Sequence, residues 1–197
     1  MSSEPVVTTT AVVLCGGESR RFGSDKTRAD LDGLPVLDTL LSSLPAGWDV
    51  LCVGPERPTG REAVRWTRED PPGGGPVAGL AAALAVVDTP VTVLLGGDMP
   101  HAGPVAAELA AHLDDVPDAD AVAGVDGEGH VQPLLAAYRT SALRAALPET
   151  PAGTPLRRLL DGLLIEPRPV EGRASQDIDT PEDLQRARRH VVPRLAP

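Results

Sequence analysis

The sequence predicts an α/β protein built on a mainly parallel sheet. Short apolar runs typical of strands alternate with longer periodic runs typical of helices over most of the chain. The clearest strand is 91–95, which is apolar apart from Thr92, as expected of a strand covered on both faces. The length of 197 residues suits one domain. We expect a flexible N-terminal tail at 1–9 and a single domain at 10–192.

The expected strands are apolar runs that stop at Gly or Pro turn signals. They cover about 10–15, 48–53, 63–67, 91–95, 120–125 and 130–137, with a short extended piece at 28–31. The last two long strands are separated by the turn 126–129, which makes a hairpin plausible. A late strand at 164–170 contains Pro167 and Pro169, which restrict it to an edge of the sheet.

The expected helices lie between these strands. They cover about 35–44, 77–87, 104–113, 141–147, 155–163 and 181–190. Pro35 occupies an allowed position in the first turn of its helix. The last helix has the strongest start signal, because Thr180 can cap it, Pro181 follows and acidic residues fill the first turn.

Composition and charge exclude several classes of protein. The formal net charge of −10 argues against non-specific nucleic-acid binding and against anionic membrane surfaces, which select basic patches. There is no basic N-terminal region followed by a long apolar core, and no apolar run approaches the ~20 residues that span a bilayer. We therefore expect a cytoplasmic protein, with Cys15 and Cys52 as small buried residues rather than a disulfide.

The stretch after the first expected strand is a small, polar and basic loop. The strand ends at Leu14 and Cys15, two glycines follow, and Arg21 and Lys26 belong to a basic exception in an acidic chain. Lys26 is the only lysine among 18 basic residues. Its compact, strongly hydrated charge on a flexible stem suits a phosphate ligand. We interpret the loop as the phosphate-binding element of a nucleotide site.

A second strand end complements this loop. Gly16-Gly17 follows the first strand, and Gly96-Gly97-Asp98 follows the strand at 91–95. In open α/β sheets, ligands bind beyond the carboxyl ends of the strands, and free amides of successive glycines form anion-binding nests. Amides and Lys26 would meet phosphates, while Asp98 would hold Mg²⁺, which favours one or two carboxylates plus phosphate oxygens. The pair predicts a site for a metal–nucleotide complex.

Two better-known nucleotide loops do not fit. A Walker loop requires Gly-Lys-Ser/Thr, whereas Gly23 is separated from Lys26 by Ser24 and Asp25. The dinucleotide fingerprint requires Gly-x-Gly-x-x-Gly, which the segment 16–19 does not supply. Neither a P-loop NTPase nor a dehydrogenase is indicated.

Four motifs in order carry a resemblance to a known family. The first, Leu14-Cys15-Gly16-Gly17-x-Ser19-x-Arg21-Phe22-Gly23-x-Asp25-Lys26, resembles the signature of MobA-like nucleotidyltransferases, the molybdenum cofactor guanylyltransferases and their relatives. Cys15 and Phe22 depart mildly from the usual alanine and methionine. The segments 75–80, 97–100 and 177–184 resemble the family's Gly-Pro-Leu-Ala-Gly, Gly-Asp-Met-Pro and Asn-x-Asn-Thr-Pro-Glu-Asp-Leu motifs, and Gln132-Pro133-Leu134 resembles its acceptor-side strand.

The resemblance implies a Rossmann-like, three-layer fold and a Mg²⁺-dependent transfer of a nucleoside monophosphate with release of pyrophosphate. By motif, Leu14 to Gly17 would line the nucleotide pocket, and Arg21 and Lys26 would contact phosphates. The segment at Asp70 and Gly75 would contact the nucleoside. Asp98 would bind the metal. Asp177 or Asp179 would complete the metal shell.

The best-known branch of the family transfers GMP from GTP to molybdopterin carrying molybdenum, and we take this as the expected reaction. Asp177 and Asp179 replace asparagines common in that branch, which leaves a CTP-dependent enzyme or another phosphorylated acceptor open. A non-catalytic nucleotide-binding module is a third and more remote reading. Contact with proteins that supply or accept the cofactor is a further expectation.

Overall fold

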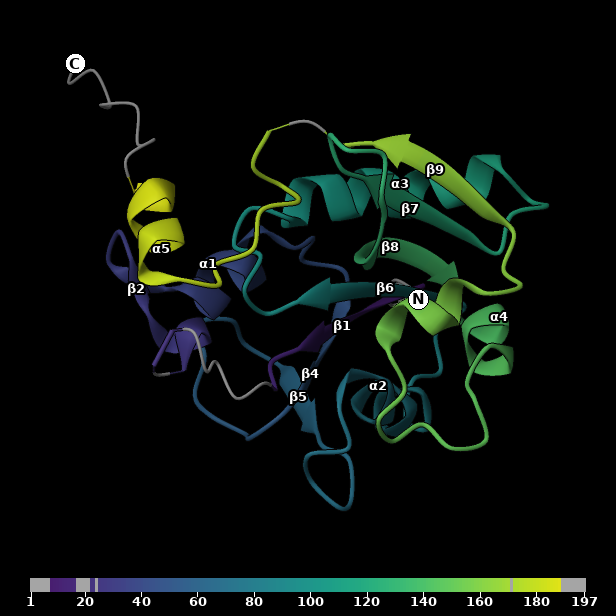
Figure 1. The fold of residues 1–197 in the computed structure, drawn as a ribbon, viewed down its shortest axis with the longest axis horizontal. Helices are drawn as coiled ribbons and strands as arrows, with labels where there is room; N and C mark the ends of the chain where they lie inside the picture. The colour runs from purple at the N-terminus through teal and green to yellow at the C-terminus, as the bar shows by residue number, and fades with distance from the viewer. Residues whose placement is uncertain (1–7, 17–21, 24, 171, 189–197) are drawn as a thin grey trace, which may run out of the picture.

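A seven-stranded sheet forms the centre of the molecule (Figure 1). The computed structural model describes residues 8–16, 22–23, 25–170 and 172–188, so most of the expected tail at 1–9 lies outside the described residues. The strand order is β5-β4-β1-β6-β8-β7-β9. The strands are β1 (Thr9–Leu14), β4 (Asp49–Val53), β5 (Val64–Thr67), β6 (Val91–Gly96), β7 (Ala121–Val125), β8 (Val131–Arg139) and β9 (Ile165–Pro169). The short strands β2 (Asp30–Leu31) and β3 (Leu34–Pro35) form a separate pair.

The sheet is mainly parallel, as predicted. β5, β4, β1 and β6 run parallel to one another, β8 is antiparallel to β6 and β7, and β9 is parallel to β7. β9 lies at the edge of the sheet, where its two prolines break no central ladder. The carboxyl ends of β1 and β6 coincide, because Leu14 pairs with Gly96.

Helices cover both faces of the sheet and make three layers. They are α1 (Val36–Ser43), α2 (Pro76–Leu84), α3 (Gly103–Asp115), α4 (Thr140–Ala145) and α5 (Pro181–Arg188), with 3-10 turns η1 (Lys26–Arg28) and η2 (Leu156–Leu160). Ala11 and Val13 of β1 belong to the cluster that includes α1 and α3, whereas Val12 belongs to the cluster with α2 and α4. The alternation of side chains along a strand therefore supplies both hydrophobic layers.

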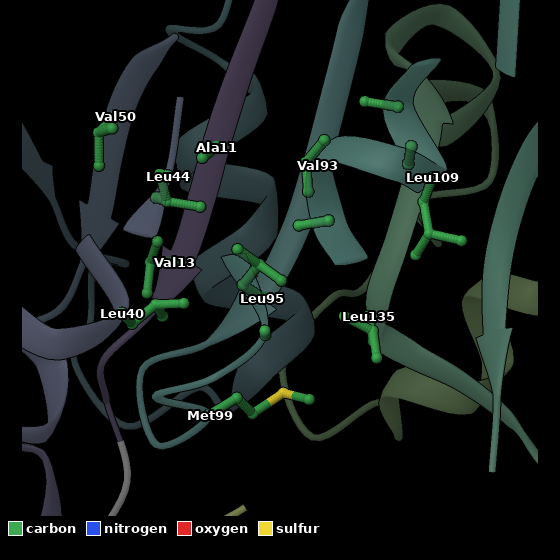
Figure 2. Packing of buried hydrophobic residues seen from close by; sticks show 14 of the residues in the cluster. Ala11, Val13, Leu40, Leu44, Val50, Val93, Leu95, Met99, Leu109 and Leu135 are labelled. Atoms are coloured by element: carbon green, nitrogen blue, oxygen red, sulfur yellow. The ribbon is translucent and has the colours of Figure 1, made fainter. Parts of the chain in front are cut away.

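Figure 2 shows the cluster between the sheet and helices α1 and α3 from close by. Leu40 of α1 lies beside Val13 of β1, Leu109 of α3 lies on the side of β6 and β8, and Met99 extends this cluster toward the carboxyl end of β6. The two helices approach closely, since a Cβ added at Gly103 would lie 2.1 Å from the Ser43 Oγ. With few aromatic residues in the chain, aliphatic side chains and close helix contacts form this core.

Arginine side chains form hydrogen bonds to the carboxyl ends of three helices, at the end of the sheet where β4 and β6 begin. Arg61 donates to the carbonyl oxygen of Leu41, in the last turn of α1, at 3.0 Å and to that of Leu44, just beyond the helix, at 2.9 Å. Arg139 donates to three carbonyls at the end of α3 and beyond it, and Arg144 donates to two at the end of α2 and beyond it. Planar guanidinium groups satisfy several unpaired carbonyls at once, and their charge complements the negative helix terminus.

Some elements differ from the expectation. The helix predicted at 155–163 is only the 3-10 turn η2, which follows Pro155 and is succeeded by Gly162 with a φ of +84°. Pro35 belongs to β3 and precedes α1 instead of lying in its first turn. The last two residues of the helix predicted to His190 lie outside the described part of the chain. None of the helices that the structure describes is long and apolar enough to cross a membrane.

Candidate active site

The two glycine-rich strand ends lie against each other. The Gly97 amide donates to the Leu14 carbonyl at 2.9 Å, which continues the pairing of β1 with β6. A Cβ at Gly97 would lie 3.2 Å from the Cys15 Sγ and 3.3 Å from the Leu14 oxygen. Glycine is therefore the residue that lets the two backbones approach, and the predicted proximity of the two strand ends is confirmed.

Asp98 sits directly after this contact. A Cβ at Gly96 would lie 2.5 Å from the Asp98 Oδ1, so the absence of a side chain at position 96 leaves room for the carboxylate. The Asp98 carbonyl accepts a hydrogen bond from the Ile178 amide at 3.0 Å. Ile178 is buried in a small cluster with Leu31, Val36 and Leu184. This anchor brings the segment before α5 to the end of β6.

Three carboxylates gather around this anchor. Asp98, Asp177 and Asp179 each offer an oxygen within 4.8 Å of the others. The Lys26 Nζ lies 2.5 Å from the Asp98 Oδ2 and 2.6 Å from the Asp179 Oδ1. The side chains of Lys26 and Asp98 are only 17% and 18% exposed, so this ion pair is partly shielded from water. Sequence motifs far apart in the chain thus form one charged site.

The pKa shifts follow from this arrangement. Burial acts to lower the pKa of Lys26, but hydrogen bonds and charges from Asp179 and Asp98 outweigh it and raise the pKa. Burial, assisted by the charges of Asp179 and Asp98, raises the pKa of Asp177, and Lys26 opposes this effect. Lys26 therefore stays protonated and positively charged. The ionised form of Asp177 is disfavoured beside the other two carboxylates.

The donor set fits a divalent cation of the hard type. Mg²⁺ and related ions bind carboxylate oxygens, and one or two protein carboxylates together with phosphate oxygens are a common arrangement. Asp98, Asp177 and Asp179 supply such oxygens, and among the residues that the structure describes this is the one group of three or more acidic, His or Cys side chains arranged to hold a metal. The ammonium of Lys26 shows that the carboxylates already accommodate positive charge.

Lys26 is presented by a short, capped turn. It begins η1, and the Asp25 Oδ1 accepts hydrogen bonds from the Thr27 amide at 3.1 Å and the Thr27 hydroxyl at 2.6 Å. Asp25 is thus an N-cap of this turn. Lys26 lies between two residues whose side chains are bonded to each other.

The remaining predicted residues are placed as follows. Asp70 is exposed in the loop between β5 and α2, two strands from β1 along the same edge, and the structure does not bring it into the carboxylate cluster. Gly75 precedes α2 with a φ of +89°, which favours glycine. Leu14, Cys15 and Gly16 form the end of β1 and the residues just after it. Gly17 and Arg21 lie outside the described residues.

Both cysteines are free and buried, as predicted. A hydrogen bond that the Cys15 thiol donates to Cys52, with burial, raises the pKa of Cys15 well above its usual value. The thiol is therefore kept protonated and is a packing group rather than a nucleophile.

A cavity of about 240 Å³ adjoins the cluster on the side of α5, and no local sequence pattern predicts it. Asp177 and Arg186 line it, together with His101. Burial, with the charge of Arg173, lowers the pKa of His101. The Nε2 of His101 is buried without a hydrogen-bond partner among the described residues. The space offers a mixed polar lining beside the carboxylates.

The chain is similar to known proteins over most of its length. A family model described as the MobA-like NTP transferase domain matches residues 11–168. A probable molybdenum cofactor guanylyltransferase of Natronomonas pharaonis is 30% identical over 200 residues, which cover 92% of this chain and 98% of the relative.

Solved structures show the same architecture. The molybdopterin-guanine dinucleotide biosynthesis protein A of Archaeoglobus fulgidus has a TM-score of 0.72 at 26% identity and covers 91% of this chain and 97% of its own. A Mycobacterium tuberculosis protein in complex with manganese has a TM-score of 0.69 at 20% identity and covers 94% of this chain and 100% of its own. The second similarity is one of fold.

Proposed function

The chain belongs to the MobA-like NTP transferase family, and from this premise we propose that it is a Mg²⁺-dependent enzyme transferring GMP from GTP to the phosphate of a molybdopterin cofactor, with release of pyrophosphate. The relative from Natronomonas pharaonis and the structure from Archaeoglobus fulgidus, whose names include guanylyltransferase and molybdopterin-guanine dinucleotide, support the choice of both substrates. The proposal includes a cytoplasmic location and transient contact with proteins that supply or receive the cofactor.

One observation carries the proposal: a lysine and three carboxylates share the edge where two glycine-rich strand ends meet. Lys26 contacts Asp98 and Asp179 directly, and Asp177 completes the group. A triphosphate needs positive charge and free amides, and its metal needs carboxylate oxygens. The site offers the positive charge of Lys26 and the carboxylate oxygens within one ion-pair network.

The residues of the chain contribute to catalysis mainly by aligning the reacting groups and neutralising their charge. An acceptor phosphate is already ionised near pH 7, so a general base adds little. Lys26 holds positive charge where the phosphates lie, and catalysis rests on alignment and on charge neutralisation at the α-phosphate and the leaving pyrophosphate. A divalent cation on Asp98, Asp177 and Asp179 would supply further charge neutralisation at phosphate oxygens.

We assign the nucleotide and the acceptor to different parts of the site at the carboxyl end of the sheet. We assign the nucleotide to the end of β1, with Leu14, Cys15 and Gly16, and to the Asp70–Gly75 loop. Gly17 and Arg21, which lie outside the described residues, keep in this proposal the nucleotide and phosphate contacts expected from the sequence motif. The cavity beside Asp177 is lined by residues that follow β6 and by residues of α5 and the segment before it, and we assign the acceptor to it. The polar lining from His101 and Arg186 suits a phosphorylated acceptor.

A nucleotide panel followed by a turnover assay tests the proposal. Calorimetry with GTP, CTP and ATP in the presence of Mg²⁺ should show preferred binding of GTP, with binding lost in EDTA. Turnover with a molybdopterin acceptor should release pyrophosphate only with the preferred nucleotide, and parallel assays with Mg²⁺ and Mn²⁺ identify the working metal.

Other outcomes have definite meanings. A preference for CTP would assign the chain to the cytidylyltransferase chemistry that the Asp177 and Asp179 carboxylates leave open. Tight binding of a metal–nucleotide complex without pyrophosphate release on any acceptor would identify a binding module and refute the proposed reaction.

A further inference from the structure

Arg57 lies in the loop after β4, and its charged side chain is largely shielded from water. Its side chain is 9% exposed, and its guanidinium lies 5.6 Å from the centre of the Trp66 ring on β5. Stacking over an aromatic face orients a guanidinium plane. Arg57 is therefore held in one direction by the strand next to its own.

That direction points Arg57 at the turn that carries Lys26. Its Nη1 donates to the Asp25 Oδ2 at 2.8 Å, and its Nη2 donates to the Thr27 hydroxyl. The other Asp25 oxygen accepts from the Thr27 amide and hydroxyl. Arg57, Asp25 and Thr27 thus form a closed network around the residue between them.

The two sides of the turn have different partners. On one side, the Lys26 amine reaches Asp98 and Asp179 at the carboxylate cluster. On the other side, the residues before and after Lys26 are bonded to Arg57. The residues on both sides of Lys26 are therefore bonded to the loop after β4, which supplies no ligand to the cluster. Arg28 also pairs with Asp25, at 3.3 Å, but from within the turn itself.

We propose that Arg57 is a positioning residue for nucleotidyl transfer, which fixes Asp25 and Thr27 so that Lys26 enters the site in one orientation. Arg57 has no contact with the carboxylate cluster among the described residues, so its effect passes through the η1 turn. The kinetic part of this inference rests on the proposed function, whereas the orientation of Lys26 does not. Lysine at position 57 would keep the charge but lose the two-pronged contact.

The test compares Arg57→Met with a matched control, Arg65→Met. Arg65 pairs with Asp49 on the same edge strands but lies away from the turn. The kinetic constants for GTP with Mg²⁺ are measured by pyrophosphate release. We expect Arg57→Met to lower kcat/KM by about 10- to 100-fold, by analogy with the loss seen when a partner that orients a metal-ligating side chain is removed. Arg57→Lys should recover part of the loss, and Arg65→Met should match the wild type.

A second readout follows Lys26 without any turnover. Because Lys26 is the only lysine, its acetylation by sulfosuccinimidyl acetate can be followed by peptide mass spectrometry and separated from reaction at the N-terminal amine. A loosened turn exposes the amine, so Arg57→Met should acetylate faster at Lys26 than Arg65→Met. Rates are compared at equal folded fraction, determined by circular dichroism.

The inference is overturned if folded Arg57→Met equals Arg65→Met in both kcat/KM and the acetylation rate of Lys26. Should Arg57→Met fail to fold, Arg57→Lys and Thr27→Val replace it, because each removes part of the same contact; wild-type values in both would overturn the inference. If the wild type itself has no transferase activity, the proposed function fails, and the acetylation comparison still decides the role of Arg57.

Discussion

Replacing Asp177 with asparagine should stabilise the metal-free protein and weaken its stabilisation by Mg²⁺. Asp177 shares the cluster with Asp98 and Asp179, and Lys26 contacts only the latter two by the short ion pairs described above. Burial and the neighbouring carboxylates raise the pKa of Asp177, so its ionised form is disfavoured in the folded state. Asparagine keeps the shape of the side chain and removes the charge.

The size of the effect follows from Coulomb's law. The carboxylate oxygens lie within 4.8 Å of one another. Asp177 is exposed in the folded chain and its carboxylate is desolvated only in part, so a water-like dielectric applies, and each like-charge pair then repels by about 0.9 kcal/mol. Two carboxylates repel Asp177 and one ammonium attracts it, so the net gain on neutralisation is about 1 kcal/mol. For a domain of this size, that corresponds to a rise in Tm of about 2–4 °C.

The assay is thermal unfolding followed by circular dichroism, first in EDTA and then with increasing Mg²⁺. In EDTA, Asp177→Asn should melt above the wild type. With Mg²⁺ the difference in Tm between Asp177→Asn and the wild type should decrease or change sign. The variant lacks one metal-binding carboxylate, and each tenfold loss of metal affinity removes about 1.4 kcal/mol of stabilisation at saturating metal. Asp161→Asn serves as the control, since Asp161 forms an exposed ion pair with Arg158 that contributes little.

The pH dependence supplies a check on sign. A carboxyl whose folded pKa is raised destabilises the protein above that pKa, and this cost disappears as the pH falls toward the ordinary carboxyl value near about 4. The difference in Tm between Asp177→Asn and the wild type should therefore shrink as the pH falls from neutrality. An Asp177→Asn protein that melts at or below the wild-type temperature in EDTA at pH 7 would refute the reasoning.

Three further predictions concern the site and the core. Lys26→Ala should lower turnover by about 10²- to 10³-fold, as for other lost electrostatic contacts to a transition state, and an unchanged rate of pyrophosphate release would contradict the mechanism. Gly103→Ala should cost about 1–3 kcal/mol in denaturant unfolding because the new Cβ would overlap Ser43; Gly127→Ala, where the space is open, is the control, and equal midpoints would contradict the packing. Tyr138→Phe should cost about 1 kcal/mol, because it removes a hydroxyl bonded to a backbone carbonyl 3.0 Å away; a midpoint equal to that of the wild type would show that the bond contributes nothing.

Local sequence signals account for much of the fold. The apolar segment at 91–95 becomes β6, and Pro167 and Pro169 correctly indicated an edge strand. These predictions hold because both effects depend on the residue type at the position itself. A strand buried on both faces must be apolar, and a proline lacks the N–H that a central strand needs. The segment 155–163 was predicted wrongly, since its leucines gave a helical pattern that Pro155 and Gly162 limit to a 3-10 turn.

Long-range pairing explains what the sequence could not predict about the site. Lys26, Asp98 and the 177–179 segment could be selected by residue type and motif, but the ion pair of Lys26 with Asp179 joins positions 153 residues apart. No sequence pattern around Arg57 predicts its role, because that role depends on its contacts with Trp66 and with the η1 turn, which lie elsewhere in the chain. Residue type and motif identify the residues of the site, whereas only the fold shows which of them are in contact.

The arginine contacts at the helix ends have a consequence for how the molecule opens. Arg61, Arg139 and Arg144 join helix termini to neighbouring segments at the edge where β4 and β6 begin, so fraying there must break several hydrogen bonds to charged groups together. The opposite edge is held near Lys26 by ion pairs that a triphosphate and its metal would rearrange. Amide hydrogen exchange should accordingly be slowest at the arginine-bound edge, so that local unfolding is confined to the side from which ligands enter.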